Sequence, residues 1–200
     1  MPFFVNKHTL IPRFDTEVLV ESVIKHTKEG ESILDMCTGS GCIAVVLAKH
    51  GYAVTASDVS LRALNIAKKN AALNDVKVDF VKSNLFEKFY GKTFDAIVCN
   101  PPYIKTAEIG KHDKSVLHEP AKALDGGADG LDFYRKIGGQ AALHLNDGGQ
   151  IFLEISSEQL EDVKTILQSG GFCDIKVIKD ARGLLRVINA RKNKGIKERI

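Results

Sequence analysis

A buried strand, a glycine-rich turn and a buried helix follow one another without a break in this 200-residue sequence. Residues 32–37 form the apolar strand segment, residues 38–41 the turn, and residues 42–49 a segment that is apolar nearly all round. The glycines permit a tight turn and let a ligand approach the backbone, and the first N–H groups of the helix attract an anionic group. This succession predicts the first half of a nucleotide-binding β-α-β unit.

An acidic residue follows the next predicted strand. Residues 53–57 are apolar enough for that strand, and Asp58 comes directly after them, 23 positions (58 − 35) after Asp35. A carboxylate in this place can accept hydrogen bonds from both vicinal hydroxyls of a ribose. An ordinary crossover connection without a ligand remains the alternative, because a glycine-rich turn by itself is a weak signal.

A fourth predicted strand, residues 94–99, ends in the sequence Asn-Pro-Pro-Tyr. Neither Pro101 nor Pro102 can donate a backbone hydrogen bond, so the strand has to stop there. The prolines also hold Asn100 extended at the edge of the sheet, where its amide can point outwards. Together with the ring of Tyr103, this arrangement suits a flat group with a polar nitrogen, which includes both a carboxamide and the amino group of a base.

The other segments complete an alternation of helices and strands. A helix is expected after residue 13, with Asp15 or Thr16 as its cap, and the loop over 104–130 is irregular and polar, as lids and binding loops are. Further helices are expected at 61–72, 131–145 and 159–168, and further strands at 76–81, 150–154, 173–179 and 184–190. The sequence therefore predicts an α/β fold with a Rossmann-like seven-stranded sheet, mostly parallel with an antiparallel last strand, and helices on both faces.

Composition agrees with one globular domain over residues 1–200 that ends in a basic tail from about residue 191. The net charge of +3, from 28 basic and 25 acidic residues, is too small to indicate a nucleic-acid partner. No apolar run approaches the ~18 residues of a membrane span, and no secretory leader is evident, so we expect a cytoplasmic protein. No metal site is expected, because the four cysteines have neither a CxxC pair nor zinc spacing and are interpreted as buried, reduced thiols: Cys37, Cys42, Cys99 and Cys173.

Several blocks of the sequence, taken together, resemble the HemK/PrmC family. They are residues 9–17, Asp35 with Met36-Cys37-Thr38-Gly39-Ser40-Gly41, residues 100–104, Glu119-Pro120, Ala123-Leu124, Gly126-Gly127, Asp129-Gly130-Leu131 and Gly183 with Arg186. Members of this family are methyltransferases that use S-adenosylmethionine. They methylate the side-chain nitrogen of the glutamine in the Gly-Gly-Gln motif of peptide chain release factors, and S-adenosylhomocysteine is the product.

Two other functions stay open on the sequence. Asn-Pro-Pro-Tyr alone is shared with adenine-N6 DNA methyltransferases and several RNA methyltransferases, so an enzyme that methylates amino groups of adenine or guanine is one alternative. A non-catalytic module that binds the cofactor or a partner is the other. A strongly basic face or an added recognition domain would favour nucleic acid, and neither is evident in the sequence.

The resemblance implies a set of site residues. Asn100, Pro101 and Tyr103 are expected to be catalytic, because the first two would accept the amide hydrogens of the glutamine and the tyrosine would pack on the amide plane; Pro102 joins them in binding the substrate. The glycine turn would contact the methionine part of the cofactor, Asp58 the ribose, and Asn84 with Leu85 the adenine. The expected cofactor residues are thus Arg13, Thr16, Asp35, Cys37, Thr38, Gly39, Ser40, Gly41, Asp58, Val59, Asn84, Leu85 and Asn100.

The chain departs from the family pattern in four respects. Cys37 stands where glycine is usual, Phe14 where a second proline is usual, and Asn84 where an aspartate often contacts adenine. The small helical domain that precedes the catalytic domain in the family, and helps hold the release factor, is absent from this sequence. We therefore expect a catalytic domain alone, acting as a monomer, and we assign no role to Glu119.

Overall fold

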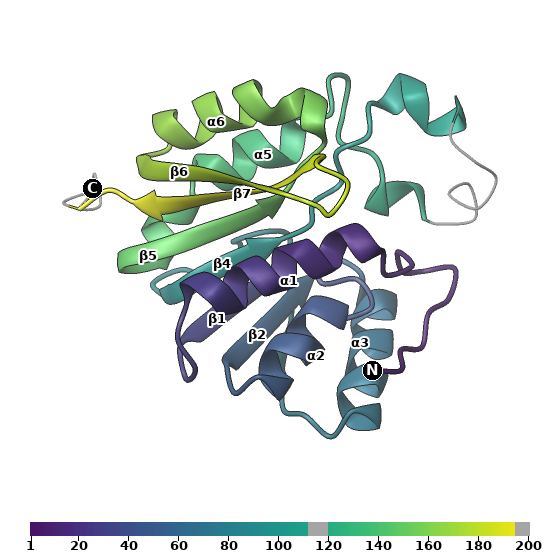
Figure 1. The fold of residues 1–200 in the computed structure, drawn as a ribbon. Coiled ribbons are helices and arrows are strands. Elements are labelled where there is room, and N and C mark those ends of the chain that lie inside the picture. Colours follow the sequence, from purple (N-terminus) through teal and green to yellow (C-terminus); the bar gives the residue numbers. More distant parts are fainter. Residues whose placement is uncertain (112–119, 195–200) are drawn as a thin grey trace.

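The centre of the protein is a seven-stranded sheet (Figure 1), seen in a computed structural model that describes residues 1–111 and 120–194. Its strands are β1 (Ser32–Met36), β2 (Ala53–Asp58), β3 (Asp79–Lys82), β4 (Phe94–Cys99), β5 (Leu145–Glu154), β6 (Phe172–Lys179) and β7 (Leu185–Lys192). They lie in the order β3-β2-β1-β4-β5-β7-β6. The five strands from β3 to β5 in this order run parallel to one another, and β7 is antiparallel to both β5 and β6. The predicted sheet is confirmed.

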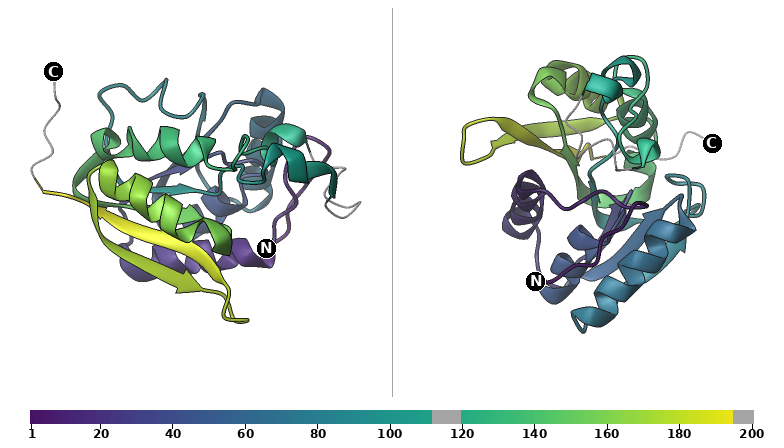
Figure 2. Two further views of the ribbon diagram at one scale, coloured as in Figure 1. Left: turned by 90° about the horizontal axis from the view of Figure 1, so that it is seen from above. Right: turned by 90° about the vertical axis from the view of Figure 1, so that its right-hand side faces the viewer.

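Helices cover both faces of this sheet (Figures 1 and 2). On one face lie α1 (Phe14–His26), α2 (Cys42–Lys49) and α3 (Leu61–Leu73); on the other lie α5 (Asp132–Gly138) and α6 (Leu160–Ser169). Successive side chains of a strand point to opposite faces, so β4 supplies Ala96 and Val98 to the first layer and Ile97 and Cys99 to the second. Burial on both faces explains why the central strands are apolar throughout.

The topology brings the predicted site residues to one edge. β1 pairs in parallel with β2 on one side and with β4 on the other. The carboxyl ends of all three strands therefore meet at the point where the strand order reverses, which is where open α/β sheets bind ligands. Asp58 ends β2 and Asn100 follows β4 directly.

Three expectations about local structure are wrong in detail. The helix expected over 131–145 ends at Gly138, and a short 3-10 turn, Ala141–His144, follows it. A Cβ added at Gly138 would lie 2.6 Å from Cγ2 of Ile166, so this residue allows α5 and α6 to pack closely. β5 begins at Leu145 rather than after the two glycines 148–149, because these residues form an irregularity within the strand.

The third difference concerns the start of α1. Neither Asp15 nor Thr16 caps the helix; Arg13 occupies the N-cap position without a side-chain cap bond. The two predicted caps have other partners, because the Asp15 carboxylate pairs with Arg182 and Arg186, and the Thr16 hydroxyl bonds to Glu154.

A few other expectations are settled or fall outside the structure. All four cysteines are free thiols, although only Cys99 is buried and the other three are half-buried. β7 extends to Lys192, two residues into the stretch expected to be a tail. In the described ranges no helix is long and apolar enough to cross a bilayer. Glu119 and tail residues 195–200 lie outside the described residues.

Candidate active site

A crevice of about 380 Å³ lies at the carboxyl ends of β1, β2 and β4. This volume is within the range of small-molecule sites, ~300–1,000 Å³. Its walls come from the segment before α1, the turns after β1, β2 and β3, and the end of β4. The lining includes these predicted residues: Thr16, Cys37, Thr38, Gly39, Ser40, Asp58, Val59, Asn84, Leu85, Asn100 and Pro102.

The glycine turn is held in shape by Asp35. One carboxylate oxygen, Oδ2, accepts hydrogen bonds from the Thr38 hydroxyl at 2.6 Å and from the backbone N–H of Ala44 at 3.1 Å. Burial raises the pKa of Asp35 to about 7. Its other oxygen, Oδ1, is buried without a hydrogen-bond partner among the described residues.

Gly41 is required at its position for two reasons that can be separated. Its φ is +80°, and an added Cβ would lie 2.8 Å from the Cβ of buried Ala67 on α3. We expect Gly41→Ala to lower the free energy of unfolding by about 2–5 kcal/mol, the sum of backbone strain and overpacking. Denaturant unfolding monitored by circular dichroism measures this loss.

Gly30→Ala is the matched control for that substitution. Gly30 has a φ of +87°, but nothing lies within 4 Å of a Cβ added there. It should therefore show the strain alone, about 1–2 kcal/mol. Equal losses in both variants would contradict a packing role for Gly41 against α3.

Asp58 connects two loops that border the crevice. Its Oδ2 accepts from the backbone N–H of Gly39 at 3.0 Å, and its Oδ1 accepts from the backbone N–H of Ser60 at 2.8 Å. Burial raises the pKa of Asp58, and these backbone hydrogen bonds oppose the shift. Each carboxylate oxygen has a second lone pair, so the group can still accept from ligand hydroxyls.

Asn84 and Leu85 form another part of the lining. The Asn84 side-chain amide donates to Oε1 of Glu87 at 2.8 Å, so its carbonyl oxygen is the group it can offer a ligand. Leu85 has a φ of +48° and is nearly buried, which presents an apolar surface beside this polar edge. This pair suits the amino group and flat face of a purine.

Asn100 lines the crevice and is expected to contact the substrate. It is linked through Thr16 to the buried carboxylate of Glu154. Its Nδ2 lies 3.3 Å from Oγ1 of Thr16, and that hydroxyl donates to Oε2 of Glu154 at 2.8 Å. The Tyr103 hydroxyl lies 3.5 Å from Oε1 of the same glutamate. Glu154 is 2% exposed, and burial raises its pKa to about 7.

Sequence reasoning missed Glu154. The available signal was an acid directly after the apolar run 151–153 at the carboxyl end of β5, beside the strand that Asn100 follows. The remaining predicted residues do not border the crevice. Arg13 borders a hollow between α1 and the β6–β7 hairpin. Asp35 bonds to Thr38 of the turn, and Gly41 packs against Ala67. Pro101 and Tyr103 are chain neighbours of the lining residues Asn100 and Pro102.

Known proteins share this sequence and fold. Residues 13–129 match the family model described as Methyltransferase small domain. The release factor glutamine methyltransferase of Thermodesulfovibrio yellowstonii is 43% identical over 200 residues, which cover 96% of this chain and 72% of that protein. A methyltransferase from Pyrococcus furiosus, 23% identical, superposes with a TM-score of 0.72 over 96% of this chain and 88% of that chain, which supports the fold.

A solved structure with the same specificity in its name also matches. The release-factor-specific protein-(glutamine-N5) methyltransferase of Alicyclobacillus acidocaldarius is 32% identical, with a TM-score of 0.58 over 96% of this chain and 99% of that chain. The identity to the Thermodesulfovibrio protein extends over most of both chains. This chain therefore belongs to the release factor glutamine methyltransferase, or HemK/PrmC, family.

Proposed function

We propose that this protein transfers a methyl group from S-adenosylmethionine to the side-chain amide nitrogen of the glutamine in the Gly-Gly-Gln motif of a peptide chain release factor. Family membership supports the reaction and the class of substrate. The observation that carries the proposal is the orientation of Asn100. Its NH₂ group is engaged by Thr16, and no described residue donates to its carbonyl oxygen, which can accept a hydrogen bond from a substrate amide.

The residues along the crevice fit S-adenosylmethionine. When bound, this cofactor supplies a methyl group on a positively charged sulfur. Asp58 would hold the ribose hydroxyls, the turn at residues 38–41 would lie against the methionine part, and Asn84 with Leu85 would bind the adenine.

The chain's part in the reaction is to orient a poor nucleophile. An amide nitrogen is weakly nucleophilic because its lone pair is delocalised, so its position relative to the methyl group controls the rate. The Asn100 side-chain carbonyl and the Pro101 backbone carbonyl would accept the two amide hydrogens. Both contacts strengthen as positive charge builds on the nitrogen during attack. A dedicated base is not required, because the nitrogen becomes acidic after transfer and can release its proton then.

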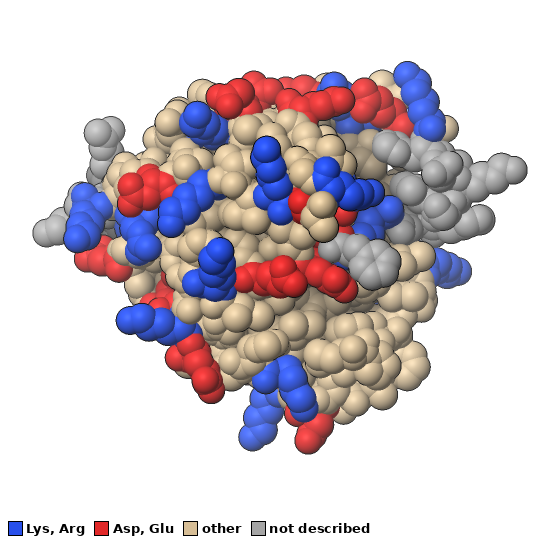
Figure 3. All heavy atoms as spheres, viewed as in Figure 1, with Lys and Arg blue, Asp and Glu red and all other residues tan. Residues whose placement is uncertain are grey.

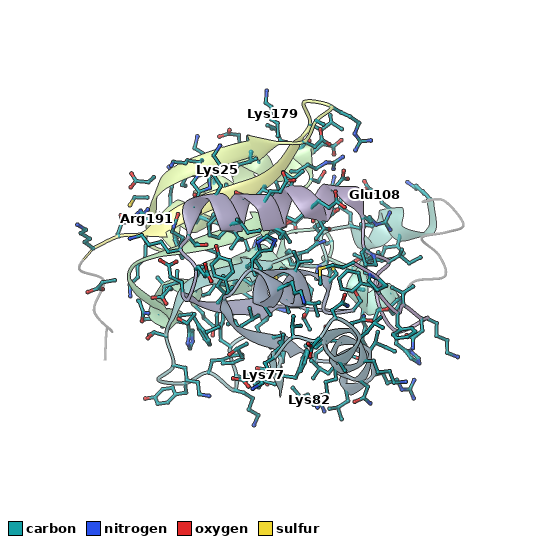
Figure 4. The ribbon with its side chains drawn as sticks, turned by 60° about the horizontal axis from the view of Figure 1, so that its bottom comes forward. Lys25, Lys77, Lys82, Glu108, Lys179 and Arg191 are labelled. Atoms are coloured by element: carbon teal, nitrogen blue, oxygen red, sulfur yellow. The ribbon has the colours of Figure 1, made fainter. Side chains whose placement is uncertain are left out.

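The charge on one face of the molecule does not favour a nucleic-acid substrate. On the face shown in Figure 3, basic and acidic side chains are interspersed rather than gathered in one patch. Figure 4 shows Lys77 and Lys82 at one end of the molecule and Lys179 and Arg191 far from them. A nucleic-acid site would require a continuous basic surface. Action on a release factor would place the protein in the cytoplasm, and we propose that it acts as a monomer.

Labelled cofactor tests this function. We expect the protein to transfer labelled methyl from S-adenosylmethionine to a release factor, and to leave unlabelled a release factor in which the glutamine of Gly-Gly-Gln is replaced by alanine. DNA and RNA, incubated in parallel, should also remain unlabelled. Label on nucleic acid but not on the release factor would show an amino-group methyltransferase, and no label on any substrate would favour a non-catalytic module.

A further inference from the structure

A polar chain of three side chains connects the buried carboxylate of Glu154 to the edge of the crevice. It is defined here as the Glu154–Thr16–Asn100 relay, and its members come from β5, α1 and the end of β4. We propose that Glu154 is a positioning residue that fixes which atom of the Asn100 amide faces the substrate, through the direction in which the Thr16 hydroxyl donates its proton. This inference rests on the proposed function and assigns a further residue to it.

The Thr16 hydroxyl determines the direction of the relay because it has a single proton. Its Oγ1 lies 2.8 Å from Oε2 of Glu154, and an ionised carboxylate can only accept hydrogen bonds. The proton therefore points to the glutamate. Oγ1 can then only accept from its other neighbour, which lies 3.3 Å away on Asn100.

The consequence for Asn100 is an amide with one allowed orientation. The two ends of an asparagine amide have the same shape, so shape alone does not fix which end faces the substrate. Because Thr16 offers only a lone pair, the NH₂ end of Asn100 must face it, and the carbonyl oxygen is left for the substrate. An amide flipped by 180° would present two N–H donors to the N–H groups of a glutamine, which cannot accept from it.

The same glutamate also holds the aromatic residue of the Asn-Pro-Pro-Tyr sequence. The Tyr103 hydroxyl lies 3.5 Å from Oε1, so the two carboxylate oxygens serve two different members of the site. The Tyr134 hydroxyl on α5 donates to the backbone carbonyl of Glu154 at 2.8 Å. Contacts from α1, α5 and the loop after β4 therefore fix the glutamate from several directions, as a positioning role requires.

Protonation of Glu154 would reverse the relay. A neutral carboxyl can donate its proton to Thr16, which then has its own proton free to donate to Asn100 and favours the flipped amide. Burial, with a smaller contribution from the charge of Asp15, raises the pKa of Glu154 to about 7, and the hydrogen bonds from Thr16 and Tyr103 and the charge of Arg186 limit this rise. The ionised, competent relay is thus present above about pH 7 and is lost below it.

Other titratable and charged groups surround the carboxylate. On the α1 side Asp15 is paired with Arg182 and Arg186, at 3.0 and 3.1 Å, which offsets its charge. The groups that face Glu154 or its immediate partners are Arg13 and Asp15 from α1 and its N-cap, Cys42 from α2, Cys99 and Tyr103 from β4 and the loop after it, Tyr134 from α5, and Asp180, Arg182 and Arg186 from the β6–β7 hairpin.

Asp35 also has a pKa raised to about 7, so a pH profile of the wild-type protein cannot by itself show which of the two carboxyl groups titrates.

Substitutions at Glu154 and at Thr16 identify the group that titrates. In wild-type protein, kcat for methylation of the release factor should fall about tenfold per pH unit below pH 7 and level off above it. Glu154→Gln removes the titrating group and should abolish this inflection. Thr16→Val keeps the shape but removes the hydroxyl, and should lower kcat about 10–100-fold at pH 8.

Two further variants act as controls. Thr16→Ser retains the hydroxyl, so its kcat should lie within about threefold of wild type. If Thr16→Val lost activity only through altered packing, Thr16→Ser, which lacks the methyl group, would lose activity as well. Thr165→Val makes the same change on the exposed side of α6, where the hydroxyl bonds only to its own helix, and should leave kcat unaltered. A ¹³C NMR titration of wild-type protein should show the Glu154 carboxyl titrating near pH 7, and Thr16→Val should raise that pKa because a hydrogen bond to the carboxylate is lost.

Failure of the relay and failure of the proposed function give different results. A wild-type inflection that persists in Glu154→Gln, or a kcat of Thr16→Val equal to wild type, would overturn the relay while methylation itself stands. A Glu154 carboxyl that titrates near its ordinary pKa would also overturn it. Absence of methylation by the wild-type protein would instead overturn the proposed function.

Discussion

Replacing Asn100 by alanine is expected to lower kcat for methylation of the release factor by about 10²–10³-fold, because the amide nitrogen loses an acceptor that orients it and stabilises its developing charge. Binding of S-adenosylmethionine should persist, since the turn at residues 38–41 and Asp58 are untouched. Single-turnover kinetics would measure the transfer step, and isothermal titration calorimetry the affinity for the cofactor.

Asn74→Ala is a suitable control for this experiment. Asn74 caps the C-terminus of α3 and bonds to backbone carbonyls, outside the crevice lining. Its loss should affect stability rather than transfer. If Asn100→Ala turned over at the wild-type rate, the assignment of Asn100 as the residue that holds the substrate amide would be wrong.

Asp58→Ala is expected to weaken the binding of S-adenosylmethionine by about 10–100-fold, or about 1.4–2.8 kcal/mol, because the carboxylate would accept from ribose hydroxyls and also ties down the Gly39 and Ser60 backbones. Asp58→Asn should fall between alanine and wild type, since one of its oxygens is replaced by a donor. Calorimetry gives the dissociation constants directly.

The control for this charge removal is Asp79→Ala on β3. Asp79 is exposed and lies outside the crevice lining, so the cofactor affinity of this variant should match that of wild type. An affinity unaltered by Asp58→Ala would count against its role with the ribose. Equal weakening by both substitutions would instead point to the overall charge of the protein.

Sequence reasoning succeeded where neighbouring residues fix the structure. The glycine turn is governed by local backbone geometry, and its glycines have the positive φ values that such a turn needs, +55° at Gly39 and +80° at Gly41. The end of β4 is likewise set by two adjacent prolines. The meeting of Asp58 and Asn100 at one edge follows from parallel strands and needs no knowledge of side-chain packing.

It failed where the outcome depends on contacts distant in sequence. Glu154 and Thr16 are separated by 138 positions, and nothing near either residue reveals the pairing. The predicted helix over 131–145 ended early at Gly138, a residue that packs against Ile166 of another helix. Thr16 was predicted to cap α1 because threonine is common at helix N-caps. Its hydroxyl instead donates a hydrogen bond to the buried carboxylate of Glu154.

The position of the added methyl group tests the central claim most directly. A release factor would be incubated with the protein and S-adenosylmethionine, digested, and the peptide with the Gly-Gly-Gln motif fragmented in a tandem mass spectrometer. The account predicts one added methyl group on the side-chain nitrogen of that glutamine with wild-type protein, and none with Asn100→Ala. A methyl group on any other residue, or the same modification with Asn100→Ala, would contradict it.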